Sequence, residues 1–156
     1  MDTITTMAMS IQNPLLTNIG MLLNDYVIYV AVLLVLVFVG EKRNKKREKI
    51  FLAIIIAAIA ALSLKELLVH DRPCVETGWC PYGYSFPSAH AATVFALMLP
   101  FLNKKNYVGY LAFALFVSFT RLNLGVHIFQ DIAGGLIVAI LSYYIVDIIY
   151  RGKKNG

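Results

Sequence analysis

Long apolar segments separated by short polar ones dominate the pattern of this chain. The apolar segments cover residues 21–40, 50–69, 89–102, 107–119 and 126–150. Several of them approach or reach the roughly 20 residues that a helix needs to cross a bilayer. We therefore expect an all-α fold, a polytopic bundle in which these five segments are transmembrane helices.

The first 20 residues are less apolar, and Pro14 interrupts them. Asn13 followed by Pro14 is typical of a helix start, with Asn as the cap and Pro at the first helical position. This segment is either an interfacial helix or a short partial span. The predicted total is five to six transmembrane helices.

Composition supports a membrane protein. Hydrophobic residues make up 59% of the chain, whereas soluble domains contain roughly 45–50% apolar residues. A length of 156 residues fits one domain, residues 1–156. These values argue against a soluble helical protein, and the N-terminus lacks the basic region expected of a cleavable signal.

The net charge of +5 is unevenly distributed. Eleven of the fourteen Lys and Arg residues lie in three polar segments, 41–50, 103–106 and 151–156. Alternating crossings of the five helices place all three segments on one face, which the positive-inside rule assigns to the cytoplasm. The basic charge thus indicates membrane topology with a cytoplasmic C-terminus, and it argues against a nucleic-acid partner.

The remaining cations, Lys65, Arg72 and Arg121, fall on the opposite, outer side. His90 and His127 belong to the same side. Three cations without a cluster of metal ligands predict an anion pocket. The planar fork of Arg and the point charge of Lys both suit a phosphate group.

Two local patterns add candidate chemistry. Ser88 precedes an apolar helix and is a predicted N-cap, which would offer backbone N–H donors to a phosphate. His127 and Asp131 are four residues apart, so on a helix they share a face and can form a hydrogen bond. A carboxylate that fixes the tautomer of a histidine leaves the other ring nitrogen free to attack.

Together these residues resemble the three-part signature of the type 2 phosphatidic acid phosphatase superfamily. Its members include lipid phosphate phosphatases, bacterial undecaprenyl diphosphate phosphatases and vanadium haloperoxidases. The matching segments are 65–73, 87–90 and 120–131, which read Lys65-x6-Arg72-Pro73, Pro87-Ser88-Ala89-His90 and Thr120-Arg121-x5-His127-x3-Asp131. Ala89 stands where Gly is common and Thr120 where Ser is common, and neither difference changes the charge.

The resemblance implies a role for each matching residue. His127 corresponds to the nucleophile that forms a phosphohistidine, Asp131 to the residue that orients it, and His90 to the general acid. The implied phosphate-binding groups are Lys65, Arg72, Arg121, Ser88 and the backbone N–H of Ala89. The family chemistry implies neither a metal nor another cofactor.

The predicted function is hydrolysis of a lipid phosphate at the extracytoplasmic face of the membrane. A polyprenyl diphosphate of the undecaprenyl or dolichyl type is the first choice of substrate, and phosphatidate or phosphatidylglycerophosphate is the alternative. A non-catalytic protein that binds lipid phosphate, or a small channel or transporter, belongs to another class. The intact set of His90, His127 and Asp131 argues against the former, and spans without central charges argue against the latter. The lipid tail and the oligomeric state stay open.

The chain contains two cysteines, Cys74 and Cys80, both in the predicted outer loop. An even number of cysteines in an oxidising location favours a disulfide that closes this loop over the site. Free thiols are the alternative.

Overall fold

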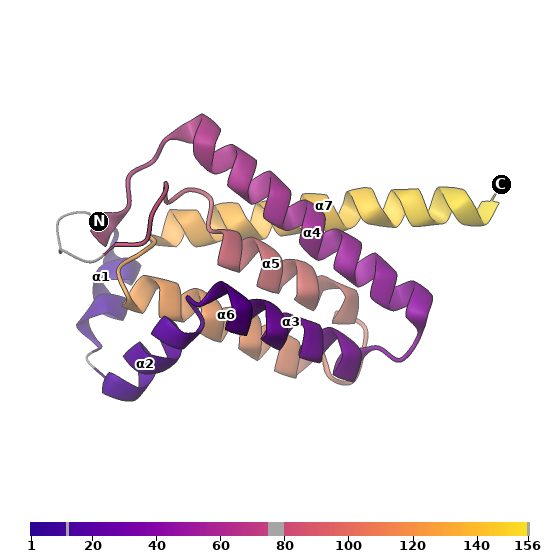
Figure 1. Ribbon diagram of the computed structural model, residues 1–156, viewed down its shortest axis with the longest axis horizontal. Coiled ribbons are helices and arrows are strands. Elements are labelled where there is room, and N and C mark those ends of the chain that lie inside the picture. Colours follow the sequence, from indigo (N-terminus) through magenta and orange to yellow (C-terminus); the bar gives the residue numbers. More distant parts are fainter. Residues whose placement is uncertain (12, 75–79, 156) are drawn as a thin grey trace.

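Helices form the framework of the protein in the computed structural model, which describes residues 1–11, 13–74 and 80–155 (Figure 1). In chain order they are α1 (Thr3–Ser10), α2 (Pro14–Leu22), α3 (Tyr26–Gly40), α4 (Asn44–Leu68), α5 (Ala89–Met98), the 3-10 helix η2 (Leu99–Phe101), α6 (Tyr107–Asn123) and α7 (Phe129–Asn155). The described residues contain no strand, which agrees with the predicted all-α fold.

Side-chain caps explain where several helices begin. Asn13 caps α2 by accepting a hydrogen bond from the backbone N of Leu16, with Pro14 at the first helical position. Ser88 caps α5 by accepting from the backbone N of Ala91. Both caps confirm the sequence predictions, because each satisfies an N–H that has no partner inside its helix.

The short helix α5 lies at the centre of the bundle and packs against α4, α6 and α7 (Figure 1). Its residues from 91 to 98 are all buried. A Cβ atom added to Gly135 of α7 would lie 2.7 Å from both the Cβ of Ala91 and the carbonyl oxygen of Ser88. Glycine is therefore needed at position 135 for the close approach of α7 to α5.

Two of the described helices, Asn44–Leu68 and Phe129–Gly152, are long and apolar enough to cross a membrane. The pair Pro14–Leu22 and Tyr26–Gly40 also qualifies when taken together, although the two helices are bent by 85° relative to each other. Length and composition thus support two or three crossings. The helix α6, with 17 residues, and the apolar helix Ala89–Phe101 are shorter than a standard span.

Helix boundaries differ from the sequence expectation at two places. The helix α4 begins at Asn44, six residues before the apolar segment, because Lys, Arg and Glu are good helix formers and most of their side chains here face outward. The helix α7 begins at Phe129 rather than at Val126, so His127 lies in the turn that precedes the helix.

The bundle has two chemically distinct ends. We call one the basic end; it comprises the α3–α4 connection with the first turns of α4 (residues 41–49), the turn at 102–106 and the C-terminal part of α7. Hydrogen bonds from Lys104 to Glu41 (2.8 Å) and from Lys49 to Asp147 tie these three regions together. The predicted clustering of the basic segments at one end is therefore present. We call the other end the histidine end; it comprises α1, α2, the described parts of the α4–α5 connection (residues 69–74 and 80–88) and the turn 124–128 (Figure 1).

Candidate active site

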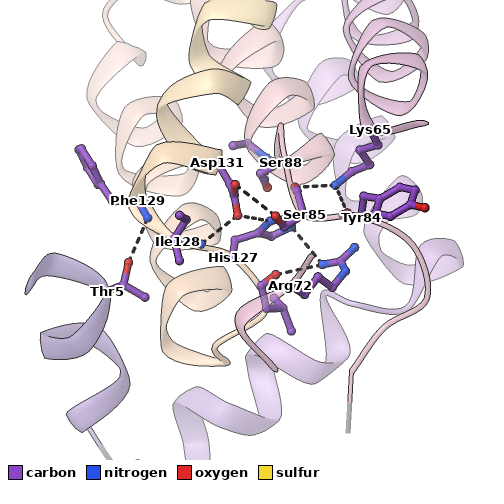
Figure 2. Close-up of polar contacts among 12 residues, drawn as sticks. Thr5, Lys65, Arg72, Tyr84, Ser85, Ser88, His127, Ile128, Phe129 and Asp131 are labelled. Atoms are coloured by element: carbon purple, nitrogen blue, oxygen red, sulfur yellow. Dashed lines mark hydrogen bonds and ion pairs between the residues drawn. The ribbon is translucent and has the colours of Figure 1, made fainter. Parts of the chain in front are cut away.

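The three signature segments converge at the histidine end. Lys65 comes from the last turn of α4, Arg72 from the following connection and His90 from the first turn of α5. Arg121 comes from the last turn of α6, and His127 from the turn before α7. All five residues line one cavity of about 630 Å³, and Figure 2 shows His127 between Arg72 and Asp131.

His127 and Asp131 form a buried pair. The Nδ1 atom of His127 lies 3.1 Å from Oδ2 of Asp131, and the two residues are 2% and 1% exposed. The sequence predicted that both residues share a helix, but His127 precedes α7 and only Asp131 lies in it. Asp131 lies in the first turn of α7 and reaches back, where its Oδ2 also accepts a hydrogen bond from the backbone N of Ile128 at 2.9 Å. The carboxylate thus fixes both the ring and the turn that carries it.

The tautomer of His127 follows from its neighbours. A carboxylate only accepts hydrogen bonds, so Nδ1 carries the hydrogen and Nε2 keeps its lone pair. That Nε2 lies 3.4 Å from Nη1 of Arg72, a donor. Burial lowers the pKa of His127 to about 4, although the hydrogen bond with Asp131 acts in the opposite direction. The ring is therefore neutral at pH 7, with its nucleophilic nitrogen facing a cation.

Backbone carbonyl groups hold Lys65 and Arg72. The Nζ atom of Lys65 donates to the carbonyl oxygens of Tyr84 and Ser85, each at 2.7 Å (Figure 2). The Nε atom of Arg72 donates to the carbonyl oxygen of Gly83 at 2.9 Å. A lysine has three donors and an arginine five, so both cations keep donors for a ligand.

Gly83 shows why the loop needs its glycine. Its φ of +86° lies in the region that side chains disfavour, and this conformation presents its carbonyl to Arg72. Arg72 also donates from Nη1 to the carbonyl oxygen of Val126 at 3.1 Å. Arg72 therefore joins the connection after α4 to the turn that carries His127.

Arg121 is fully buried. Its Nη1 donates to Oδ1 of Asn24 at 3.2 Å, its Nη2 donates to the carbonyl oxygen of Gly20, and its Nε donates to Oγ1 of Thr120 at 3.3 Å. These partners are neutral, so the guanidinium is held in place while its charge remains available in the cavity.

His90, like Arg121, contacts the segment where α2 ends and α3 begins. Its Nε2 lies 3.1 Å from the carbonyl oxygen of Leu23, and its ring centroid lies 4.5 Å from that of Tyr29. A carbonyl only accepts, so Nε2 carries a hydrogen and Nδ1 is the nitrogen left for proton exchange in the neutral ring.

Ser88 and Ala89 occupy different positions relative to the cavity. Ala89 lines it. Ser88 is fully buried, its Oγ accepts from the backbone N of Ala91 at 3.4 Å, and its backbone N donates to the carbonyl oxygen of Asp131 at 2.9 Å. The observed contacts of Ser88 join the second motif to the third, and its contact with phosphate stays a prediction.

Several site residues were not found from the sequence. Gly20, Leu23 and Asn24 belong to the corner between α2 and α3, and Ser85 donates to Oδ1 of Asp131 at 3.5 Å. The available signal was the polar pair Asn24–Asp25 near the start of an apolar segment. Nothing in the sequence pattern indicated that this corner contacts the signature residues.

The structure joins Cys74 and Cys80 in a disulfide, with their Cα atoms 5.4 Å apart. Residues 75–79 between them lie outside the described part of the chain. Among the described residues, no group of three or more His, Cys, Asp or Glu side chains is arranged to hold a metal ion.

Comparison with known proteins extends these findings. Residues 49–154 match the family described as the PAP2 superfamily. The chain is 29% identical over 119 residues to Putative undecaprenyl-diphosphatase YbjG of Escherichia coli (strain K12), covering 69% of this chain and 58% of that protein. It is 32% identical over 96 residues to Phosphatidylglycerophosphatase B of Bacillus subtilis (strain 168), covering 53% of this chain and 47% of that protein. The chain thus spans about half the length of these curated relatives.

The fold is also similar to solved structures. The crystal structure of Aquifex aeolicus LpxE aligns with a TM-score of 0.73 at 22% identity, over 91% of each chain. The crystal structure of a transmembrane PAP2 type phosphatidylglycerolphosphate phosphatase from Bacillus subtilis aligns with a TM-score of 0.72 at 22% identity, over 96% of this chain and 83% of that one. At this identity the similarity concerns the fold.

Proposed function

This chain belongs to the PAP2 superfamily, and from that premise we propose that it is an integral membrane phosphatase that hydrolyses a lipid phosphate through a phosphohistidine. The observation that carries the proposal is the His127–Asp131 pair, whose unprotonated Nε2 lies 3.4 Å from Nη1 of Arg72 in a cavity that Lys65 and Arg121 also line.

The charge balance of the cavity supports an anionic substrate. None of the ion pairs among the described residues includes Lys65, Arg72 or Arg121. The carboxylate of Asp131 is engaged by His127 and by the backbone of Ile128. Three cations held by neutral groups are suited to bind a phosphoryl group and to stabilise the charge that develops on its oxygens.

The rest of the cavity supports a lipid tail. Beyond the charged residues it continues between α3 and α4, where its lining is apolar and comprises Val30, Leu33, Leu34, Phe51, Ile54, Ile55, Ala58 and Leu62. From Leu62 back to Phe51 the helix rises about 16 Å, at 1.5 Å per residue. A hydrocarbon chain attached to a phosphate would lie along this groove while its headgroup reaches His127.

The reaction then follows from the geometry. The lone pair on Nε2 of His127 attacks phosphorus, an N–P bond forms, and the bond from phosphorus to the leaving oxygen breaks. His90, when protonated, gives a proton to that oxygen. The oxygen of a water molecule then attacks phosphorus, His90 takes a proton from that water, and the N–P bond breaks with its electron pair returning to Nε2, so that phosphate and neutral His127 result. These steps use only side chains of this chain, so we expect activity without an added metal.

The position in the membrane is also part of the proposal. Five crossings, formed by α3 to α7 with α5 extended by η2, would place the basic end in the cytoplasm by the positive-inside rule. The cavity would then open to the extracytoplasmic face. The C-terminus would be cytoplasmic.

For the substrate, we propose a polyprenyl diphosphate of the undecaprenyl type. The name of the relative YbjG supports this choice. Phosphatidate and phosphatidylglycerophosphate are the alternatives, and the name of the B. subtilis relative supports the latter. Each has the phosphoryl group and the apolar tail that the cavity can accommodate.

Phosphate release from purified protein tests the proposal. The panel would contain undecaprenyl diphosphate, phosphatidate and phosphatidylglycerophosphate, each with and without EDTA. We expect release from at least one lipid, no loss with EDTA, and a decrease of about 1,000-fold or more in His127→Ala. Equal activity of wild type and His127→Ala would refute the mechanism. Loss of activity with EDTA would indicate a metal that the mechanism does not include.

A further inference from the structure

The corner between α2 and α3 contacts the active site although it lies outside the three signature segments. The two helices are bent by 85° at this break. The backbone N of Asn24 donates to the carbonyl oxygen of Met21 at 3.0 Å, a tighter turn than the helix would make. In a continued helix, that N–H would instead bond to the carbonyl of Gly20. The bend therefore leaves the Gly20 carbonyl available to another donor.

That donor is Arg121. The Gly20 carbonyl accepts from its Nη2, and Oδ1 of Asn24 accepts from its Nη1 at 3.2 Å. A Cβ atom on Gly20 would lie 3.1 Å from Cδ1 of Leu124, so glycine lets α2 approach the end of α6 closely. The C-terminal end of a helix carries partial negative charge, which favours a guanidinium there.

The same corner also fixes His90. The carbonyl oxygen of Leu23 lies 3.1 Å from Nε2 of His90. Two backbone carbonyls and one side chain within residues 20–24 thus contact one phosphate-binding candidate and one proton-transfer candidate. Asn24 is the residue of this corner whose side chain both lines the cavity and bonds to Arg121.

We propose that Asn24 is a positioning residue, which aims the Arg121 guanidinium at the phosphoryl group; this inference rests on the proposed phosphatase function. The amide is suited to the task because it accepts a hydrogen bond without cancelling the positive charge. An aspartate of the same shape would also accept, but it would neutralise Arg121 and repel the phosphate. The neighbouring Asp25 does not have this effect, because its carboxylate is exposed and caps α3.

Three variants separate positioning from structural support. Asn24→Ala removes the acceptor, and we expect kcat/KM to fall about 10-fold. Asn24→Asp keeps the acceptor, and we expect a fall of about 10-fold or more that appears mainly as a higher KM. Asn123→Ala is the matched control, because Asn123 donates to the carbonyl oxygens of Ala8 and Ile11 and so ties the C-terminal end of α1 to α6. We expect its kcat/KM to stay within 2-fold of wild type.

The Asp variant decides between the two roles. If Asn24 only supported the fold, Asn24→Asp would restore activity because the hydrogen bond to Arg121 is retained. Restoration to within 2-fold of wild type, or wild-type activity of Asn24→Ala, would overturn the proposal. Melting temperatures of all variants in the same detergent identify any loss that comes from unfolding, and Asn24→Asp keeps the test valid if Asn24→Ala does not fold.

A double-mutant cycle tests whether Asn24 acts through Arg121. In an Arg121→Lys background we expect Asn24→Ala to change kcat/KM by less than 2-fold, whereas a further 10-fold loss would contradict the proposal. Failure of this proposal can be distinguished from failure of the proposed phosphatase function. A wild-type protein inactive on every lipid would reject the phosphatase, whereas an active wild type with unaffected Asn24 variants would reject only the positioning role.

Discussion

Cationic side chains lie at both ends of the bundle, but they have different partners. At the basic end, the cations that form ion pairs have carboxylate partners, whereas Arg47 donates to the backbone carbonyl oxygens of Glu41 and Phe38. Lys104 lies 2.8 Å and Arg43 3.0 Å from Glu41, and Arg151 lies 2.7 Å from Asp147. Each of these cations therefore has a carboxylate within hydrogen-bond distance, with Glu41 shared by two of them.

At the histidine end the partners of Lys65, Arg72 and Arg121 are neutral groups. Lys65 and Arg72 donate to backbone carbonyls, and Arg121 donates to a backbone carbonyl and to the Asn24 amide. A carbonyl orients a cation without cancelling its charge, so the positive potential is available to a ligand. Carboxylate partners are therefore found at the basic end, whereas none of the ion pairs among the described residues includes the three cations of the cavity.

The largest expected effect compares one cation from each end. Arg72→Ala removes a donor that faces Nε2 of His127, and we expect kcat/KM to fall by about 100-fold or more. Lys104→Ala removes a cation of the basic end, and we expect kcat/KM to stay within 2-fold of wild type. Phosphate release at several lipid concentrations measures both. Similar losses in the two variants would break the distinction between the ends.

The pKa of His127 tests whether the histidine end is buried as the structure shows, and so sharpens the comparison between the two ends. Burial lowers its pKa to about 4, so the neutral form persists as the pH falls and is lost only near pH 4. At pH 5.5 a histidine with the usual pKa of 6.5 would be only about one-tenth neutral. We therefore expect about 10-fold more neutral His127 at pH 5.5 than this reference value predicts.

The ring NMR signal of His127 in the substrate-free protein measures this titration. The chain has three histidines, so His127→Ala assigns the signal. The unfolded chain binds this proton more readily between about pH 6.5 and 4, so the contribution to stability decreases as the pH falls through that range. A midpoint at or above 6.5 would show that the ring is not buried as the structure indicates.

Much of the site could be predicted because its chemistry is encoded locally. Ser88 before an apolar helix predicted a cap, and the charge census isolated Lys65, Arg72 and Arg121 because the other cations lay in three short segments. His127 and Asp131 were paired correctly, although the predicted geometry was wrong. A spacing of four is compatible with a shared helix, but it is equally compatible with a turn followed by the first turn of a helix.

The contributions of the α2–α3 corner could not be predicted in the same way. Hydrophobic periodicity shows which face of a helix is buried, but it does not show which distant segment covers that face. The contact of Asn24 with Arg121 joins residues 97 positions apart, and it depends on a bend that no proline or glycine marks at residues 23–25. The start of α4 at Asn44 also differs from the prediction, because charged residues alone do not distinguish an exposed helical turn from a loop.

The smallest expected effect concerns stability at the basic end. Glu41 is 4% exposed and accepts hydrogen bonds from Arg43 and Lys104, which lower its pKa, with the bond from Arg43 the larger cause. Glu41→Gln removes the charge, and we expect a loss of about 1 kcal/mol in the free energy of unfolding with kcat/KM within 2-fold of wild type. Because the pKa is lowered in the folded state, this contribution is fully present above the unfolded value of 4.5 and decreases progressively as the pH falls from that value toward the lower pKa of the folded state. Unfolding in mixed micelles at pH 7 and pH 4 measures the loss of free energy and its dependence on pH.

Arg151→Ala is the control for an exposed ion pair, and we expect it to lower the free energy of unfolding by no more than about 0.5 kcal/mol. A loss of lipid hydrolysis in Glu41→Gln without a loss of stability would mean that the basic end takes part in the reaction, and the division between the two ends would fail.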